Sequence, residues 1–172
     1  MHRSTGSILA GVMFLCMPHV AAGQESSAAA QAGGAPSPAP WGAFCSSDGR
    51  REALDCQIEQ RVVVSNSGQL LAAVAVRLPR DGSAPVLVVQ TPFGLFLPAG
   101  LKLAVDDKEL KSLPLRTCDA SGCYADTPAT DDLVAAMQRG NTLSVTFEDV
   151  SQNKIAVPVS LYGFSAALDK AR

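Results

Sequence analysis

The residues best suited to covalent chemistry in this sequence are five cysteines. Cys16 lies in an apolar N-terminal segment that has the features of a cleavable signal peptide, so four cysteines are expected in the exported chain: Cys45, Cys56, Cys118 and Cys123. An even number of cysteines in an oxidising compartment predicts disulfides, and four cysteines allow three pairings. We predict the two local pairings, Cys45–Cys56 and Cys118–Cys123. Closing loops of these lengths should stabilise the fold by roughly 2–3 kcal/mol each.

The spacing of these cysteines does not favour two other roles, a zinc site and a redox-active pair. A zinc site with four thiolate ligands would normally show paired C-x-x-C spacings, which this sequence lacks. A redox-active Cys118–Cys123 pair would normally show the C-x-x-C spacing of thioredoxin-like proteins within a βαβ unit, and neither feature is present. We therefore expect structural disulfides and no metal.

Histidine is missing from the sequence after residue 19. Its absence excludes Ser-His-Asp and Cys-His catalysis and histidine-ligated metals in the expected folded part. Ser160 and Lys154 do not make a catalytic dyad, because six residues of extended chain separate them by about 20 Å. We predict a protein that is not an enzyme, with no catalytic residues and no cofactor.

Two groups of carboxylates are candidate sites. Asp106, Asp107 and Glu109 could hold calcium, but their spacing lacks the calcium-loop pattern and suits a solvated turn. The second group could supply paired acid–base carboxylates if it met around Cys118–Cys123, although two of its members fit the start of a helix better. Its members are Asp119, Asp126, Asp131 and Asp132.

The chain divides into three parts by composition. Residues 1–22 combine a short basic start, an apolar stretch too short to span a bilayer and small residues suited to cleavage, which predicts a secretory signal peptide. Residues 23–40 are rich in Ala, Pro and Gly and predict a disordered tether. Residues 41–172 form a single predicted domain without a transmembrane segment. Near-neutral charge without a Lys/Arg run argues against nucleic-acid binding.

The predicted domain is mainly β. Alternating or continuous apolar residues predict strands over 41–45, 57–65, 69–78, 85–91, 141–149 and 154–162. Pro158 places the last of these at a sheet edge or a bulge. Thr130 and Gly140 bracket a predicted helix whose apolar face is Leu133, Val134 and Met137, and a short helix is expected over 166–170. Many short strands and few helices predict an antiparallel β-sandwich with one or two short helices, held by local disulfides.

The stretch from 92 to 123 is expected to organise the domain. An apolar loop at 92–100 leads into an alternating strand at 101–106, and the two cysteines follow, so we predict one hairpin closed by a disulfide at its far end. Phe93, Leu95, Phe96 and Leu97 either fill one end of the sandwich or form an exposed patch that contacts a partner.

The sequence resembles the invasion-associated locus B family of bacterial exported proteins. The matching segments run in order along the predicted domain: Trp41 with Cys45 and Cys56, TPFGLFLPAG (91–100), VD (105–106), RTC (116–118), GC (122–123) and PVSLYGFSAA (158–167). The resemblance implies a small secreted or envelope-associated β protein without a defined active site. The family is named for a role in bacterial entry into host cells.

Together these features favour an exported, non-catalytic protein of the bacterial periplasm, outer surface or medium. Its partner is expected to be a protein of the envelope or of a host cell. The alternatives are a periplasmic binding or assembly factor and, from a different class, a histidine-free hydrolase that uses carboxylates.

Overall fold

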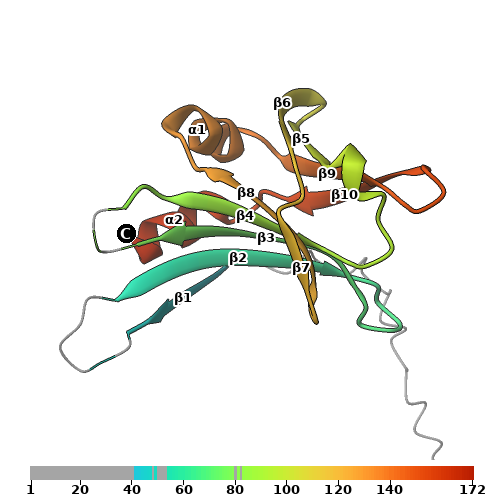
Figure 1. Cartoon of the computed structure of the whole chain (residues 1–172). Helices are drawn as coiled ribbons and strands as arrows, with labels where there is room; N and C mark the ends of the chain where they lie inside the picture. The colour runs from blue at the N-terminus through green and yellow to red at the C-terminus, as the bar shows by residue number, and fades with distance from the viewer. Residues whose placement is uncertain (1–40, 48, 50–53, 80, 82) are drawn as a thin grey trace, which may run out of the picture. The chain divides into compact units, whose positions relative to one another are not determined.

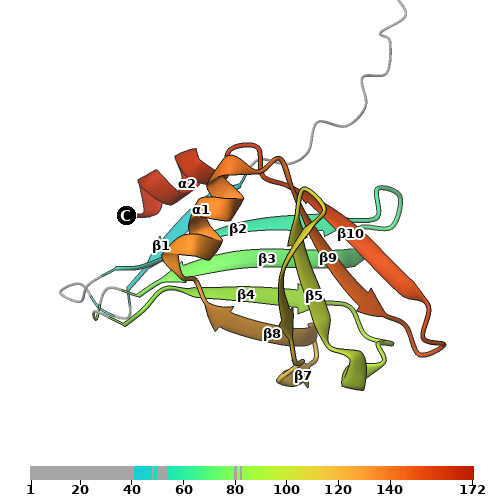
Figure 2. The same ribbon diagram turned by 90° about the horizontal axis from the view of Figure 1, so that it is seen from above.

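A computed structural model describes residues 41–172 except 48, 50–53, 80 and 82, and these residues form two antiparallel β-sheets that face each other across one core (Figure 1). The predicted signal peptide (1–22) and tether (23–40) lie outside the described residues. Seen from above, the strands of the smaller sheet run obliquely across those of the larger one (Figure 2). The predicted mainly β sandwich with two short helices is confirmed.

The larger sheet has six strands in the order β1-β2-β3-β4-β8-β7. These are β1 (Gly42–Ser46), β2 (Asp55–Val63), β3 (Leu70–Leu78), β4 (Val86–Thr91), β8 (Gly122–Pro128) and β7 (Thr117–Asp119). The smaller sheet has four strands in the order β10-β9-β5-β6. These are β10 (Lys154–Ser160), β9 (Thr142–Glu148), β5 (Leu101–Val105) and β6 (Lys108–Leu113).

Alternation along the strands creates the core. In β9, Leu143, Val145 and Phe147 are buried while the residues between them are half-buried, as the sequence predicts. Successive side chains of a strand point to opposite faces of the sheet, so these three meet the inner face of the larger sheet, which supplies residues such as Ile58 and Leu87. Each such side chain contributes about 1.5–3 kcal/mol on burial. β10, which contains Pro158, is an edge strand as predicted.

The two helices cover one end of the sandwich. Helix α1 (Asp131–Arg139) begins after Thr130, whose hydroxyl accepts a hydrogen bond from the backbone N–H of Leu133 at 3.4 Å. Its buried residues are the predicted Leu133, Val134 and Met137. Helix α2 (Phe164–Ala171) starts two residues earlier than expected. The reason is packing, because Phe164 is fully buried and its backbone is drawn into the helix.

Trp41 connects the start of the described chain to its end. Its indole is 6% exposed, lies edge-on to the ring of Phe164 with centroids 5.0 Å apart, and donates a hydrogen bond from Nε1 to the carbonyl of Ser160 at 2.9 Å. The strand predicted over 41–45 is present as β1, shifted by one residue at each end.

The stretch from 92 to 123 differs from the single hairpin predicted for it. β5 and β6 form a hairpin in the four-stranded sheet, whereas Cys118–Cys123 closes a separate hairpin, β7–β8, in the six-stranded sheet. The chain leaves one sheet for the other after Leu113, where Pro114 follows and cannot donate to a strand ladder. The sequence-based interpretation treated two consecutive hairpins as one.

Candidate functional site

The loop that follows β4 is tied to the turn between β9 and β10 by backbone contacts. Leu95 forms a β-bridge with Asp149, and the N–H of Phe96 donates to the carbonyl of Glu148 at 2.9 Å. The N–H of Val150 donates to the carbonyl of Gly94 at 3.2 Å. These two hydrogen bonds make up the bridge, and they hold two segments, more than 50 residues apart in sequence, side by side at one end of the sandwich.

The four apolar residues predicted at this loop have different environments. Leu95 is 9% exposed and belongs to the core, and Phe96 is half-buried. Phe93 is 58% exposed and Leu97 is 50% exposed. The loop thus fills the end of the sandwich with one pair of side chains and presents the other pair to solvent.

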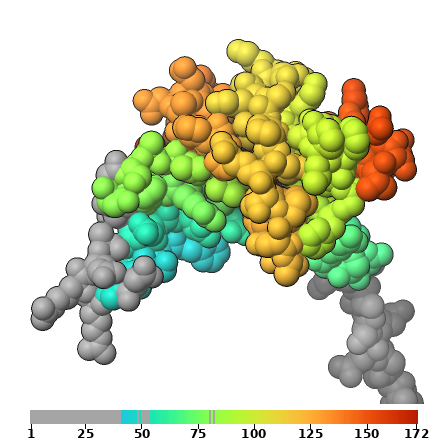
Figure 3. All heavy atoms as spheres, in the orientation of Figure 1, coloured from blue at the N-terminus to red at the C-terminus, as the bar shows by residue number. Residues whose placement is uncertain are grey.

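Val150, on the segment that is tied to this loop, adds a third exposed apolar side chain, at 71% exposure. We call these three residues the apolar tip. In the space-filling view the segment around 92–100 lies directly beside the β9–β10 hairpin (Figure 3). Sequence reasoning missed Val150, although an isolated apolar residue among the polar residues of a hairpin turn was a visible signal.

Asp149 shapes the turn that carries Val150. Its Oδ1 accepts hydrogen bonds from the N–H groups of Ser151 at 2.8 Å and Asn153 at 2.9 Å, and its Oδ2 accepts from Asn153 Nδ2 at 3.1 Å. The backbone and side-chain hydrogen bonds from Asn153 lower the pKa of Asp149 below its ordinary value. The ionised carboxylate therefore stabilises the turn that presents the tip.

Both predicted disulfides are present. Cys45 pairs directly with Cys56 across β1 and β2, with Cα atoms 4.1 Å apart, and Cys118 pairs directly with Cys123 across β7 and β8, with Cα atoms 4.0 Å apart. Because β1 and β7 are the outer strands of the six-stranded sheet, each edge of that sheet is cross-linked to its neighbour. The sequence indicated the pairs but not this placement.

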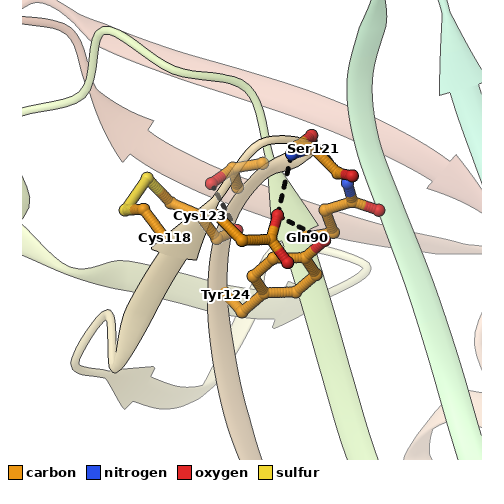
Figure 4. Close-up of a disulfide and its surroundings, with 7 residues drawn as sticks. Gln90, Cys118, Ser121, Cys123 and Tyr124 are labelled. Carbon is orange, nitrogen blue, oxygen red and sulfur yellow. Dashed lines mark hydrogen bonds between the residues drawn. A yellow bond between two sulfur atoms is a disulfide. The ribbon is translucent and has the colours of Figure 1, made fainter.

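Polar contacts surround the second disulfide (Figure 4). Asp119 Oδ1 accepts hydrogen bonds from the N–H of Ser121 at 2.7 Å and from the hydroxyl of Tyr124 at 3.3 Å. The side-chain amide of Gln90 donates to the carbonyl of Ser121 at 2.8 Å. These contacts fix the two-residue turn of the β7–β8 hairpin, which contains the disulfide.

The carboxylates considered for acid–base work have separate structural roles. Asp119 belongs to the hairpin turn just described, and Asp126 forms an ion pair with Arg116 at 2.8 Å. Asp131 and Asp132 occupy the first turn of α1, where the helix dipole favours negative charge. The structure thus assigns each of these four carboxylates to a turn, an ion pair or a helix start.

The acidic turn considered for calcium is the connection between β5 and β6. Asp106 and Asp107 have φ values of 45° and 68°, the positive values of a tight hairpin turn. The Asp106 carboxylate accepts hydrogen bonds from the N–H groups of Asn141 at 3.0 Å and Thr142 at 3.0 Å, so it ties this turn to the start of β9. Within residues 41–172, apart from the undescribed positions, no group of three or more His, Cys, Asp or Glu side chains is arranged to hold a metal ion.

A shallow hollow of about 610 Å³ opens on the outer face of the six-stranded sheet. Val86 and Val88 of β4 line it, together with Arg77, Tyr124 and the Arg116–Asp126 ion pair. The hollow combines apolar area with this ion pair and with the hydrogen bond from the Tyr124 hydroxyl to Asp119, which also lines it. Lys154 and Ser160, the dyad rejected on distance, pair with opposite ends of β9.

No helix among the described residues is both long and apolar enough to cross a membrane.

Comparison with known proteins shows which family has this architecture. The chain matches the family model described as invasion associated locus B (IalB) protein over residues 41–172. It is 30% identical over 131 residues to an invasion protein B homolog of Brucella abortus (strain 2308), covering 76% of this chain and 74% of the relative, and equally similar to the homolog of B. abortus biovar 1 (strain 9-941).

Among solved structures, the crystal structure of invasion associated protein b from Bartonella henselae matches with a TM-score of 0.66 at 23% identity, covering 78% of this chain and 92% of that one. The two proteins therefore share a fold. The family match over the whole described region confirms the resemblance carried by the sequence motifs, and the chain belongs to the invasion associated locus B family.

Proposed function

We propose that this protein is exported and non-catalytic, and that it acts by contacting another protein through the apolar tip formed by Phe93, Leu97 and Val150. The observation that carries the proposal is that three exposed apolar side chains lie on two segments, distant in sequence, whose backbones are held side by side by a hydrogen-bonded β-bridge. Exposed apolar patches are typical of interaction surfaces. Aromatic and aliphatic anchors on a fixed backbone are suited to binding because little ordering entropy is lost.

Three features support the non-catalytic part of the proposal. The sequence from 41 to 172 contains no histidine. Within the candidate clusters, Asp106 and Asp119 already accept hydrogen bonds, and Asp126 pairs with a cation. The hollow on the outer face is shallow, and its carboxylates, Asp119 and Asp126, are engaged by the Tyr124 hydroxyl and by Arg116.

Export is supported by the signal-like residues 1–22 and by two disulfides, which persist in oxidising compartments. The relatives of this chain are named invasion proteins, and we propose that the contact occurs at the bacterial envelope or on a host cell. Protease treatment of intact cells tests the location. Digestion of the protein supports an outward-facing role, whereas survival until the outer membrane is opened supports a periplasmic one.

The outer-face hollow favours a second candidate, a periplasmic factor that binds an envelope component. Val86 and Val88 provide apolar area there and Arg77 provides a cation. In this case the binding residues would be on β3 and β4 rather than at the apolar tip. Substitutions on β3 and β4 would then abolish binding, whereas substitutions at the apolar tip would not, and this distinguishes the two candidates.

Site-specific photo-crosslinking in the producing cells tests the contact. A benzoylphenylalanine placed at position 93 should form a discrete protein adduct, and Leu97→Asp in the same chain should abolish it. The matched control places the same group at Tyr162, which is 78% exposed and lies just beyond the opposite end of β10. Equal adducts at both positions, or none at 93, would contradict a contact at the tip.

A further inference from the structure

The four edge strands of the two sheets differ in how they discourage further pairing. β6 carries Lys108 and Lys111, and β10 carries Lys154 and Pro158. β7 is only three residues long and includes Asp119. Lysine, proline and short length are the usual means by which edge strands avoid joining another sheet. β1 has none of them, because its five residues, GAFCS, contain no charge and no proline.

The backbone of β1 presents hydrogen-bonding groups to its open side. The Cα separation of 4.1 Å between Cys45 and Cys56 is that of a non-hydrogen-bonded antiparallel pair, which lies near 4.5 Å rather than 5.5 Å. The N–H and C=O of Cys45 therefore point away from β2, and so do those of Ala43, two residues earlier. Both residues are exposed, and within the described part of the chain no hydrogen bond reaches these four groups.

Two features make this edge ready to pair. The Cys45–Cys56 disulfide fixes β1 to β2, so little backbone entropy remains to be lost when another strand is added. Phe44, between the two free positions, is 59% exposed on the outer face. A strand that pairs with β1 would bury part of this ring.

The sequence of β1 is self-complementary in antiparallel pairing. If the two-fold axis passes beside Phe44, Ala43 lies opposite Cys45 of the second copy and Cys45 lies opposite its Ala43. The outward N–H and C=O groups of both residues then form four hydrogen bonds. Phe44 lies opposite its own counterpart, an aromatic cross-strand pair, and Gly42 lies opposite Ser46. No charges face each other, so no like-charge repulsion opposes the pairing.

We propose that β1 is a strand-addition site whose occupant is a second copy of this chain, paired antiparallel about Phe44 so that two six-stranded sheets join edge to edge. This surface is separate from the apolar tip and does not depend on the function proposed for it. One pair of five-residue strands buries less area than the 1,200–2,000 Å² or so of a standard stable interface. The dimer should therefore form reversibly as concentration rises.

Proline substitution at matched edge positions tests the proposal on the full chain with its disulfides intact. Ala43→Pro removes an outward N–H without removing a bond to β2. Ala156→Pro is the control. Ala156 is exposed on edge strand β10 and lies two residues from Pro158, so the backbone N–H positions of these two residues are on the same side of the strand. Because Pro158 has no N–H, that side is not the one hydrogen-bonded to β9. Circular dichroism first verifies that both variants fold.

Sedimentation equilibrium should show a monomer–dimer equilibrium for the unsubstituted chain and for Ala156→Pro. Ala43→Pro should weaken it at least about tenfold, since one hydrogen bond per protomer is lost. Hydrogen exchange in the peptide spanning β1 should slow with increasing concentration of the unsubstituted chain, a readout that remains if Ala43→Pro fails to fold. A chain that stays monomeric, a dimer unaffected by Ala43→Pro, or exchange independent of concentration would overturn the proposal.

Discussion

Replacement of Trp41 measures how strongly the fold depends on the contact between the start and the end of the described chain. The indole is almost fully buried, packs edge-on against Phe164 at 5.0 Å and donates to the carbonyl of Ser160 at 2.9 Å. Burial of a tryptophan removes about 150–250 Å² from water, or about 4–6 kcal/mol as an upper estimate at 25 cal/mol per Å². Truncations of this kind usually cost about 3–5 kcal/mol.

We expect Trp41→Ala to lower the free energy of unfolding by about 4 kcal/mol. Trp41→Phe keeps a ring against Phe164 but leaves the carbonyl of Ser160 without its donor, and it should cost about 1–2 kcal/mol. The difference between the two variants separates packing from hydrogen bonding.

Urea denaturation followed by far-ultraviolet circular dichroism is the suitable assay, because these substitutions remove the chain's single tryptophan and its fluorescence. Tyr162→Ala is the control, since that aromatic side chain is 78% exposed and its loss should change stability by less than about 0.5 kcal/mol. The reasoning is refuted if Trp41→Ala costs under about 1 kcal/mol, or if Trp41→Phe costs as much as Trp41→Ala.

Three further predictions concern covalent, backbone and pH effects. Replacing both cysteines of Cys45–Cys56 with alanine should cost about 3 kcal/mol in urea denaturation, and doing so for Cys118–Cys123 about 2 kcal/mol, because the second loop is shorter. Gly122→Ala should destabilise the fold more than Gly68→Ala in thermal denaturation: both glycines have positive φ, but only a Cβ at 122 meets a backbone carbonyl of β4. Titration of the Asp149 carboxyl by NMR should show a pKa below the ordinary value. This group's contribution to stability should be present above the unfolded-state pKa and lost as the pH falls through the folded-state pKa, and Asp149→Asn should remove that pH dependence.

Local pattern was sufficient to predict much of the fold. The alternation identified the buried residues of β9 and, in β10, Val157 and Val159, because a strand with one buried face must alternate. Ile155, which the same alternation predicts to point inward, is exposed near the start of β10. The cap and stop residues of α1 identified its bounds because they satisfy the free backbone groups of a helix. The disulfide pairs followed from short sequence separation. Each of these features is decided by residues near one another in sequence.

Features decided by distant residues were missed. Leu95 is buried and Phe93 exposed because a β-bridge to Asp149 sets the orientation of the loop, and a loop has no periodicity to reveal this. Val150 joins the apolar tip for the same reason. The assignment of β5–β6 and β7–β8 to different sheets depends on which strands pair with them, namely β9 for β5 and β4 for β8. No local pattern contains that information.

The placement of the two disulfides argues for a local role beyond overall stability. The cross-links span sequence separations of only 11 and 5 residues, and the entropy model gives such short loops less stabilisation than the roughly 4.7 kcal/mol of a loop of about 100 residues. Both join an outer strand of the six-stranded sheet to its neighbour. Outer strands have neighbours on one side only and are among the first segments to open. A covalent link there keeps the edge strand in register with its neighbour. Strand addition at β1 requires such a fixed register. This local role accounts for short cross-links, although longer ones would stabilise the whole chain more.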